Sequence, residues 1–351
     1  MNTVHERPGV YSSYDASAVI GGGSAKKGIG MVVKGDTAVP GEPVTVTSYA
    51  EGYGIFGKNA IAALLLEALF LGGAGTVIVA KTAATGTVED YKAAFAVLEK
   101  EETIRLMLCD SGKLAVHQAL RTSVLEASQN RRERIAVVGG ESDVVTEMVS
   151  HAADLNCERV ILVGPNVTGT AGAPTGALYA AAAVAAAIAG NGDPVIPLNG
   201  VPLHGVEGLS KRYSDDELDL LIRGGVTPLE YVAGICSPVR CVTTRTKTGA
   251  VADSTWRETG TILVVDDVIP TIRTTLRSKF ARSKNTAQSR GAIRAQVIVE
   301  LQNKLRAEII DGYGEVKVSA QATDPTICLV EFDFTVAHGL NQIHLTAHIT
   351  V

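Results

Sequence analysis

The sequence predicts an α/β protein with a central, mostly parallel sheet that has helices on both faces. Short apolar runs rich in valine and isoleucine recur between residues 28 and 165, and helical stretches separate them. Strands that are apolar along their whole length are typical of parallel sheets buried on both sides. Gly and Ala are abundant and aromatic residues make up only 5% of the chain, which favours tightly packed layers over an all-β sandwich.

The expected central domain covers residues 23–247. Six apolar runs are predicted to be its strands, and the segments between several of them have helical periodicity. Thr87 and Ser142 precede two of these segments and are expected to cap the helices with their hydroxyl groups. The predicted strands are IGMVVKG (29–35), VTVTS (44–48), TVIVAK (76–81), IRLMLCD (104–110), RIAVVGG (134–140) and RVILVGP (159–165).

A smaller α+β domain is expected at residues 248–338. It follows a polar loop, and its apolar runs again alternate with a long helical pattern. The predicted elements are a strand at ILVVDDV (262–268), a helical region over 269–310 interrupted near Asn285, and strands at EVKVSA (315–320) and ICLVEFDFTVAH (327–338).

Both ends of the chain are expected to be extended strand arms. Residues 1–22 have no periodic apolar face, and Gly21, Gly22 and Gly23 form a predicted hinge to the body. In residues 339–351, apolar and polar residues alternate strictly, which is the pattern of an amphipathic strand. Such a strand needs a sheet to join, and the edge of its own domain and the sheet of another chain both remain open. Its apolar face consists of Ile343, Leu345, Ala347, Ile349 and Val351.

The composition argues against several classes of function. The net charge of −5 provides no basic field for binding nucleic acid. The first residues lack the apolar core of a signal peptide, and the most apolar runs, 60–71 and 177–189, are shorter than the about 20 residues that cross a bilayer. The five cysteines form no C-x-x-C pair, which favours reduced thiols in a chain made in the cytoplasm.

The stretch from Gly52 to Asn59 has the glycine and lysine spacing of a P-loop, with Lys58 in the lysine position. A nucleotide-binding loop needs its glycines directly after a strand, and a hydroxyl after the lysine to hold Mg²⁺. Here SYAE separates the strand from Gly52, and Asn59 replaces the hydroxyl. We therefore expect a tight turn and a helix start with Asn59 near the cap. A P-loop-like ATPase and a generic small-molecule α/β enzyme are the alternatives.

Other motifs for catalysis or metal binding do not occur in the sequence. There is no G-x-S-x-G elbow, no H-E-x-x-H and no G-x-G-x-x-G after a strand, and Asp110-Ser111 has no obvious histidine partner. His344 and His348 would lie about 13 Å apart on a strand, too far to share one metal ion. We expect no catalytic, cofactor-binding or metal site.

Several segments together carry a family resemblance. They are RPGVY (7–11), SYAEGYGIFG (48–57), LFLGGAGTVIVAK (69–81), residues 208–248 and GLNQIHLTAHITV (339–351). Residues 208–248 are the most specific, because a Ser-Asp-x-Glu helix leads into Gly-Val-Thr-Pro and then Val-Arg-x-Val-Thr-Thr. These segments resemble the contractile phage tail sheath proteins, in the compact form of Gram-positive phages and phage-tail-like bacteriocins. Larger members carry an additional inserted domain, for which this chain has no space.

The resemblance implies a structural subunit and not an enzyme. Subunits of this family polymerise as stacked hexameric rings around an inner tube and contract to drive the tube through a cell envelope. The implied partners are other copies of the chain, the tail tube protein, the baseplate and the tail terminator, with no cofactor, nucleic acid or membrane insertion. The implied location is a virion or phage-tail-like particle, assembled in the cytoplasm of the bacterial host.

The resemblance also implies roles for three groups of residues. Strands around Val10 and Tyr11 and around Ile343, Leu345 and Ile349 would add to the sheets of neighbouring subunits. The glycines of the N-terminal hinge and Gly339 would let the bodies rotate while the strands stay paired. A stretch without acids between residues 272 and 294 would face the tube through Arg273, Arg277, Lys279, Arg282 and Lys284, with Arg290 and Arg294 nearby.

Overall fold

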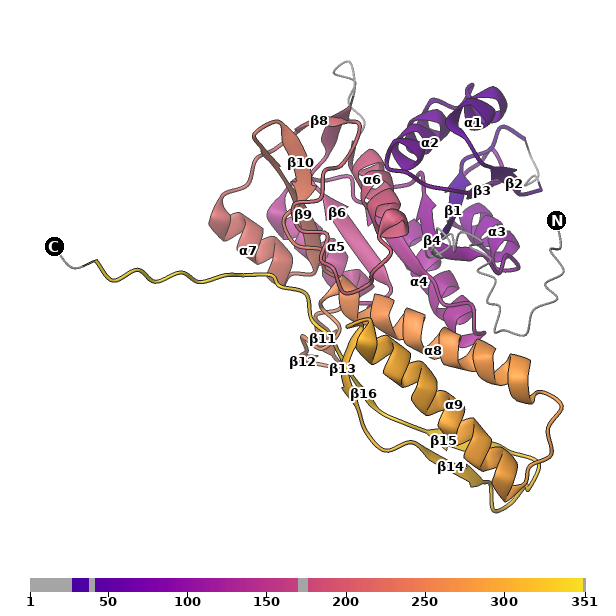
Figure 1. Cartoon of the computed structure of the whole chain (residues 1–351). Helices are drawn as coiled ribbons and strands as arrows, with labels where there is room; N and C mark the ends of the chain where they lie inside the picture. The colour runs from indigo at the N-terminus through magenta and orange to yellow at the C-terminus, as the bar shows by residue number, and fades with distance from the viewer. Residues whose placement is uncertain (1–26, 38–41, 170–175, 350–351) are drawn as a thin grey trace, which may run out of the picture.

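The computed structural model describes residues 27–37, 42–169 and 176–349 (Figure 1). The predicted N-terminal arm, with Val10, Tyr11 and the hinge glycines 21–23, lies outside the described residues, so its role stays a prediction.

The centre of the described fold is an eight-stranded sheet in the order β10-β9-β6-β5-β4-β1-β3-β2. The strands from β9 to β3 in this order run parallel, and only β2 and β10 at the two edges pair antiparallel with their neighbours. The prediction of a mostly parallel sheet is confirmed. The strands are β1 (Gly28–Val33), β2 (Val44–Val46), β3 (Val77–Lys81), β4 (Ile104–Cys109), β5 (Ile135–Gly139), β6 (Val160–Gly164), β9 (Val226–Val232) and β10 (Ile235–Pro238).

Helices cover both faces of this sheet. Successive strand residues point to opposite sides, so each buried strand presents apolar side chains on both faces. In β1, Ile29 and Met31 join one apolar cluster, whereas Val32 joins the cluster on the other face. The first face carries α1 (Tyr49–Phe56), α2 (Ala60–Leu71) and α6 (Gly176–Gly190). The second face carries α3 (Val88–Leu98), α4 (Leu114–Gln129), α5 (Val145–Leu155) and α7 (Asp215–Arg223).

The alanine-rich helix α6 lies unusually close to the sheet. Most of its residues are buried, and small side chains let its backbone approach β5. A Cβ added at Gly139 would be only 2.1 Å from the carbonyl oxygen of Ala177, so this strand position requires glycine. The two most apolar runs of the sequence form α2 and α6, which pack on each other on this face of the sheet. Both are buried helices, as predicted.

The two predicted helix caps have different outcomes. Thr87 caps α3 as predicted, in a reciprocal box with Asp90. The prediction for Ser142 is wrong, because α5 begins after Val144 and has no side-chain cap. The Ser142 hydroxyl instead accepts the N–H of Val144 at 3.1 Å and donates to Glu147 at 2.5 Å. These local bonds hold Ser142 in the turn before the helix.

The C-terminal part of the chain forms a separate layer of two long helices over short strand pairs (Figure 1). Its elements are α8 (Thr259–Phe280), α9 (Ala287–Arg306), β13 (Ile310–Tyr313) paired with β16 (Phe334–Val336), and β14 (Lys317–Ala320) paired with β15 (Cys328–Glu331). The described residues also contain the small pairs β7 (Val167–Gly169) with β8 (Val206–Leu209) and β11 (Lys247–Thr248) with β12 (Val251–Ala252).

The predicted strand at residues 262–268 is wrong, since this run lies inside α8. Val264, Val268 and Ile272 are buried four residues apart, which is helical spacing, and they share a cluster with Val297 of α9. The short run of apolar and acidic residues did not by itself distinguish a strand from a buried helix. The interruption near Asn285 is confirmed, because residues 281–286 separate α8 from α9.

Candidate functional site: the domain junction and the C-terminal segment

The stretch from Gly52 to Asn59 does not form a phosphate-binding loop. Gly52 is buried inside α1, and α2 begins immediately after Asn59. Asn59 caps α2, because its Oδ1 accepts the N–H of Ala62 at 3.1 Å and its Nδ2 donates to the carbonyl of Lys34 at 3.0 Å. The predicted tight turn and cap are therefore confirmed, because Gly57 and Lys58 form the turn between α1 and α2, where the N–H of Asn59 donates to the carbonyl of Phe56 at 2.8 Å. Gly52 and Gly54 instead belong to α1.

A histidine pair, made of the buried His117 and the half-buried His151, lies beyond the carboxyl end of β4. His117 Nδ1 and His151 Nε2 are 2.9 Å apart, and His117 Nε2 donates to the backbone carbonyl of Ser111 at 2.7 Å. Both ring nitrogens of His117 thus have partners other than the Ser111 hydroxyl, which accepts the N–H of Lys113 at 3.3 Å. The histidine is therefore not placed to activate this hydroxyl as a nucleophile. Burial lowers the pKa of His117 to about 3, which keeps the ring neutral near pH 7. This pair was not predicted from the sequence, because its members are 34 residues apart.

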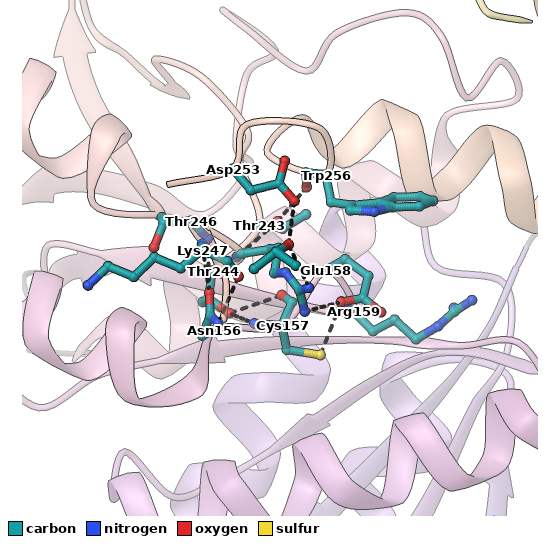
Figure 2. Close-up of polar contacts among 12 residues, drawn as sticks. Asn156, Cys157, Glu158, Arg159, Thr243, Thr244, Thr246, Lys247, Asp253 and Trp256 are labelled. Carbon is teal, nitrogen blue, oxygen red and sulfur yellow. Dashed lines mark hydrogen bonds and ion pairs between the residues drawn. The ribbon is translucent and has the colours of Figure 1, made fainter. Parts of the chain in front are cut away.

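The connector between the two domains, residues 240–248, is hydrogen-bonded to the turn that leads into β6. Figure 2 shows Asn156 and Cys157 on one side of this joint and Thr244 and Thr246 on the other, with dashed lines for the hydrogen bonds between them. Thr244 Oγ1 accepts the N–H of Cys157 and donates to its carbonyl, both at 3.0 Å. Asn156 Oδ1 accepts two successive N–H groups of the connector, at 3.0 and 3.1 Å. The last part of the segment with the most specific family resemblance, residues 240–248, therefore forms the joint between the domains.

A buried ion pair links the two domains beside this joint. Arg159, next to β6, donates from both terminal nitrogens to Asp266 of α8, at 2.7 and 2.8 Å. Each side chain is only 11% exposed. Burial lowers the pKa of Arg159, but the hydrogen bonds and charge of Asp266 outweigh it and raise this pKa overall. Burial also raises the pKa of Asp266, against the opposing effect of Arg159.

Further ion pairs lie near this contact, beside apolar packing of Ile262 and Leu263 of α8 against the central domain. Such pairs constrain orientation more than they add stability, because each charge must also be desolvated. They are Arg240 with Glu258 at 2.5 Å, Arg245 with Glu158 at 3.5 Å, Arg273 with Glu133, and Lys304 with Asp267.

The last part of the chain crosses the junction before it leaves the body. A Cβ at Gly339 would be 2.3 Å from Pro197 Cγ and 2.8 Å from the carbonyl oxygen of Val195. Two residues later, the side-chain oxygen of Asn341 accepts a hydrogen bond from Asn199 at 2.8 Å. Gly339 was expected to be a hinge, and the structure places it in a packed contact, so this role remains untested.

Beyond Asn341, the C-terminal segment extends away from the body (Figure 1). Residues 342–349 belong to no strand of the described chain. Ile343, Leu345 and Ile349 are 80%, 91% and 86% exposed. An apolar face of this size, held in water without a partner sheet, indicates a surface that binds another molecule. Within the described residues, no group of three or more His, Cys, Asp or Glu side chains is placed to hold a metal ion.

The predicted tube-facing residues are not equivalent. Arg273 pairs with Glu133 and points to the central domain, so it belongs to the junction and not to a free basic surface. Lys279 donates to Gln296 at 2.7 Å, while Arg277, Arg282 and Lys284 are exposed around the end of α8. Of the nearby basic residues, Arg290 bonds to Asn285 and Arg294 to the carbonyl of Val316.

These features define a two-domain α/β protein whose amphipathic C-terminal segment joins no strand of the described residues. Residues 84–236 match the family profile of the phage tail sheath protein central domain, and residues 251–350 match that of the phage tail sheath C-terminal domain. The two matches cover more than two thirds of the chain. The chain therefore belongs to the phage tail sheath protein family, which confirms the predicted resemblance.

A curated relative and several solved structures support this assignment. The tail sheath protein of Bacillus phage SP01 is 26% identical over 253 residues, which are 70% of this chain but 43% of the relative. The chain thus spans less than half the length of that protein. It shares its fold with the contracted helical sheath of the anti-feeding prophage (TM-score 0.73, 16% identity, 98% of this chain and 99% of that chain). A sheath tail protein of Desulfitobacterium hafniense is also similar (TM-score 0.68, 13% identity, 93% and 100% of the two chains).

No helix within the described residues is both long and apolar enough to span a bilayer.

Proposed function

We propose that this chain is the subunit of a contractile sheath. Copies polymerise as stacked hexameric rings around an inner tube, and contraction drives the tube through a cell envelope. The observation that carries the proposal is the C-terminal segment, whose apolar face is exposed and joins no strand of the described chain. The family membership and the shared fold of sheath proteins support it.

The C-terminal segment holds copies together by adding a strand to a neighbour's sheet. A strand of this length forms about five to seven backbone hydrogen bonds, each contributing about 0.5–1.5 kcal/mol net. Burial of Ile343, Leu345 and Ile349 adds to this, at about 25 cal/mol per Å² of apolar surface. The N-terminal strand around Val10 and Tyr11 acts in the same way. Copies tied by such strands stay at high local concentration while their bodies exchange contacts.

The sheath stores its energy at assembly and needs no cofactor or nucleotide. In the extended state, subunits keep surface that can still be buried between neighbours, and contraction buries it. This role agrees with the structural part played by the Gly52–Asn59 stretch, where Asn59 caps a helix. The chain is accordingly a structural protein and not an enzyme.

Other partners contact the polymer at its inside and its ends. The exposed Arg277, Arg282 and Lys284, together with Lys279, contact an acidic belt on the tube protein. Exposed ion pairs contribute only about 0–1 kcal/mol each, so they can hold the tube in register and still release it on contraction. The two ends of the sheath bind the baseplate and the tail terminator.

The test compares the two faces of the C-terminal segment. Replacing Ile343, Leu345 and Ile349 by Asn should leave a folded body that no longer polymerises, as should deletion of residues 340–351 or 1–20. Replacing Gln342, His344 and Thr346 by Ala, on the other face, is the matched control and should preserve assembly. Folding is measured by circular dichroism and assembly by negative-stain microscopy. Long sheaths from the apolar-face variant would refute the proposal.

A further inference from the structure

Residues 337–341 form a short strap that touches both domains before the C-terminal segment leaves the body. The N–H of Ala337 donates to the carbonyl of Ile309 at 3.3 Å, within the C-terminal domain. Gly339 then packs on the loop 195–199, which follows α6 of the central domain. The strap therefore lies across the same junction as the buried ion pair, and its position depends on both domains.

The contact at Gly339 has the geometry of a packing point and not of a pivot. Its nearest neighbours are the ring of Pro197 and a backbone carbonyl, neither of which can move away as a flexible side chain would. Its backbone also lies outside the left-handed region that only glycine adopts freely. Glycine is required at this position because there is no space for a Cβ atom.

Asn341 then links the strap to each domain through its side-chain amide. Its oxygen accepts from Asn199 of the central domain at 2.8 Å, and its nitrogen donates to Glu258 at 3.5 Å. Glu258 stands at the start of α8 and also pairs with Arg240 at 2.5 Å. The next residue, Gln342, is exposed, and so is every residue after it to 349.

We infer that this strap fixes the direction in which the C-terminal segment leaves the body, with Asn199, Glu258 and Asn341 as positioning residues and the pivot after Asn341. The partner to which the segment binds is a second copy of this chain, so the inference rests on the function proposed above. Residues 342–349 reach about 26 Å when extended. A fixed starting direction confines this reach to fewer orientations, which lowers the entropy lost when the segment pairs with a neighbour.

The test introduces a negative charge at the link. In Asn341→Asp, a carboxylate faces Glu258 and the amide donor is lost, so the strap should open. We expect assembly, followed by light scattering, to be about fivefold slower, which corresponds to the loss of about one net hydrogen bond. Hydrogen exchange of amides 338–342 in unassembled subunits should become faster, while the melting temperature of the body changes little. Gln342→Glu adds the same charge one residue beyond the strap and should behave like the parent.

A second change separates positioning from general damage. Adding Glu258→Gln to Asn341→Asp removes the repulsion and restores a donor opposite the new carboxylate, so assembly and exchange protection should recover. Gly339→Ala should open the strap by collision with Pro197 and slow assembly in the same way. If Asn341→Asp assembles as fast as Gln342→Glu, or the double variant recovers nothing, the strap does not position the segment. That result leaves the proposed function intact, because the proposed function is tested separately by the assembly of the apolar-face variant.

Discussion

Arg159 and Asp266 meet through two hydrogen bonds, at 2.7 and 2.8 Å, and thereby join β6 of the central sheet to α8 of the C-terminal domain. Both side chains are almost completely withdrawn from water. A buried pair of this kind is costly to break on one side only, because the remaining charge has no partner. The relative orientation of the two domains therefore depends on both residues.

Replacing Asp266 by Asn should lower the free energy of unfolding by about 3–5 kcal/mol, because it leaves the Arg159 charge buried and unpaired. The double change Arg159→Met with Asp266→Leu should recover most of this loss, since no buried charge remains. Urea unfolding of unassembled subunits measures both. Arg223→Met breaks the exposed pair with Asp219 and should cost less than about 1 kcal/mol. Equal losses in Asp266→Asn and Arg223→Met would contradict the prediction.

Asn59 and Lys58 should differ in their effect on stability. Asn59→Ala removes the cap of α2 and should destabilise the chain by about 0.5–2 kcal/mol, as judged by urea unfolding. Lys58→Ala should change neither stability nor nucleotide binding, because no phosphate loop is formed. Calorimetric titration with Mg-ATP checks the second part. Mg-ATP turnover that disappears in Lys58→Ala would instead support the ATPase alternative.

The buried His117 should make the chain less stable as the pH falls. Its pKa is lowered from 6.5 to about 3 in the folded chain by burial and by the neighbouring His151. Because the unfolded chain binds the proton more tightly, the stabilising contribution is complete above pH 6.5 and decreases between pH 6.5 and 3. The expected slope is about 1.4 kcal/mol per pH unit. His117→Gln should flatten this dependence in urea titrations, whereas His348→Gln, at an exposed position, should not.

Reversing two charges at the exposed end of α8 should disturb the contact proposed with the tube. Arg277→Glu with Arg282→Glu should fold normally but give empty or prematurely contracted sheaths in negative stain. Lys58→Glu with Lys100→Glu makes the same change in net charge at exposed positions away from this end and serves as the control. If the first variant assembles extended, tube-filled sheaths as efficiently as the parent at low and high salt, these residues do not grip the tube.

Much of the central fold could be predicted because its signals are local. The strand of IRLMLCD and the capping box at Thr87 depend on residues close in sequence. Residues 262–268 were misassigned because the short run does not by itself favour a strand over a buried helix, and the packing of α8 on α9 decides. The direction of Arg273 could not be predicted either, since Glu133 is 140 residues away.

The candidate site was also predictable only in part, because some of its features are local in the sequence and others depend on contacts between distant residues. The alternation of residues 343–349 shows in the sequence, and the exposure of their apolar face agrees with it. The junction is made by contacts between distant residues, such as Arg159 with Asp266, which are 107 residues apart. Likewise, the packing at Gly339 depends on a proline in a remote loop, and no local pattern distinguishes such a glycine from a flexible one.

The unpaired C-terminal segment also has a consequence for how long the polymer grows. A body that receives one strand and gives another makes a head-to-tail contact, which stays open along the axis of a stack. The first and last layers are then chemically different: one presents free donor strands and the other presents vacant sheet edges. Every added layer recreates the same growing end, so strand exchange through this segment does not by itself stop growth. If strands pair between copies as proposed, the final length depends on another molecule, such as one that lies inside the stack or one that pairs with the free strands at its end.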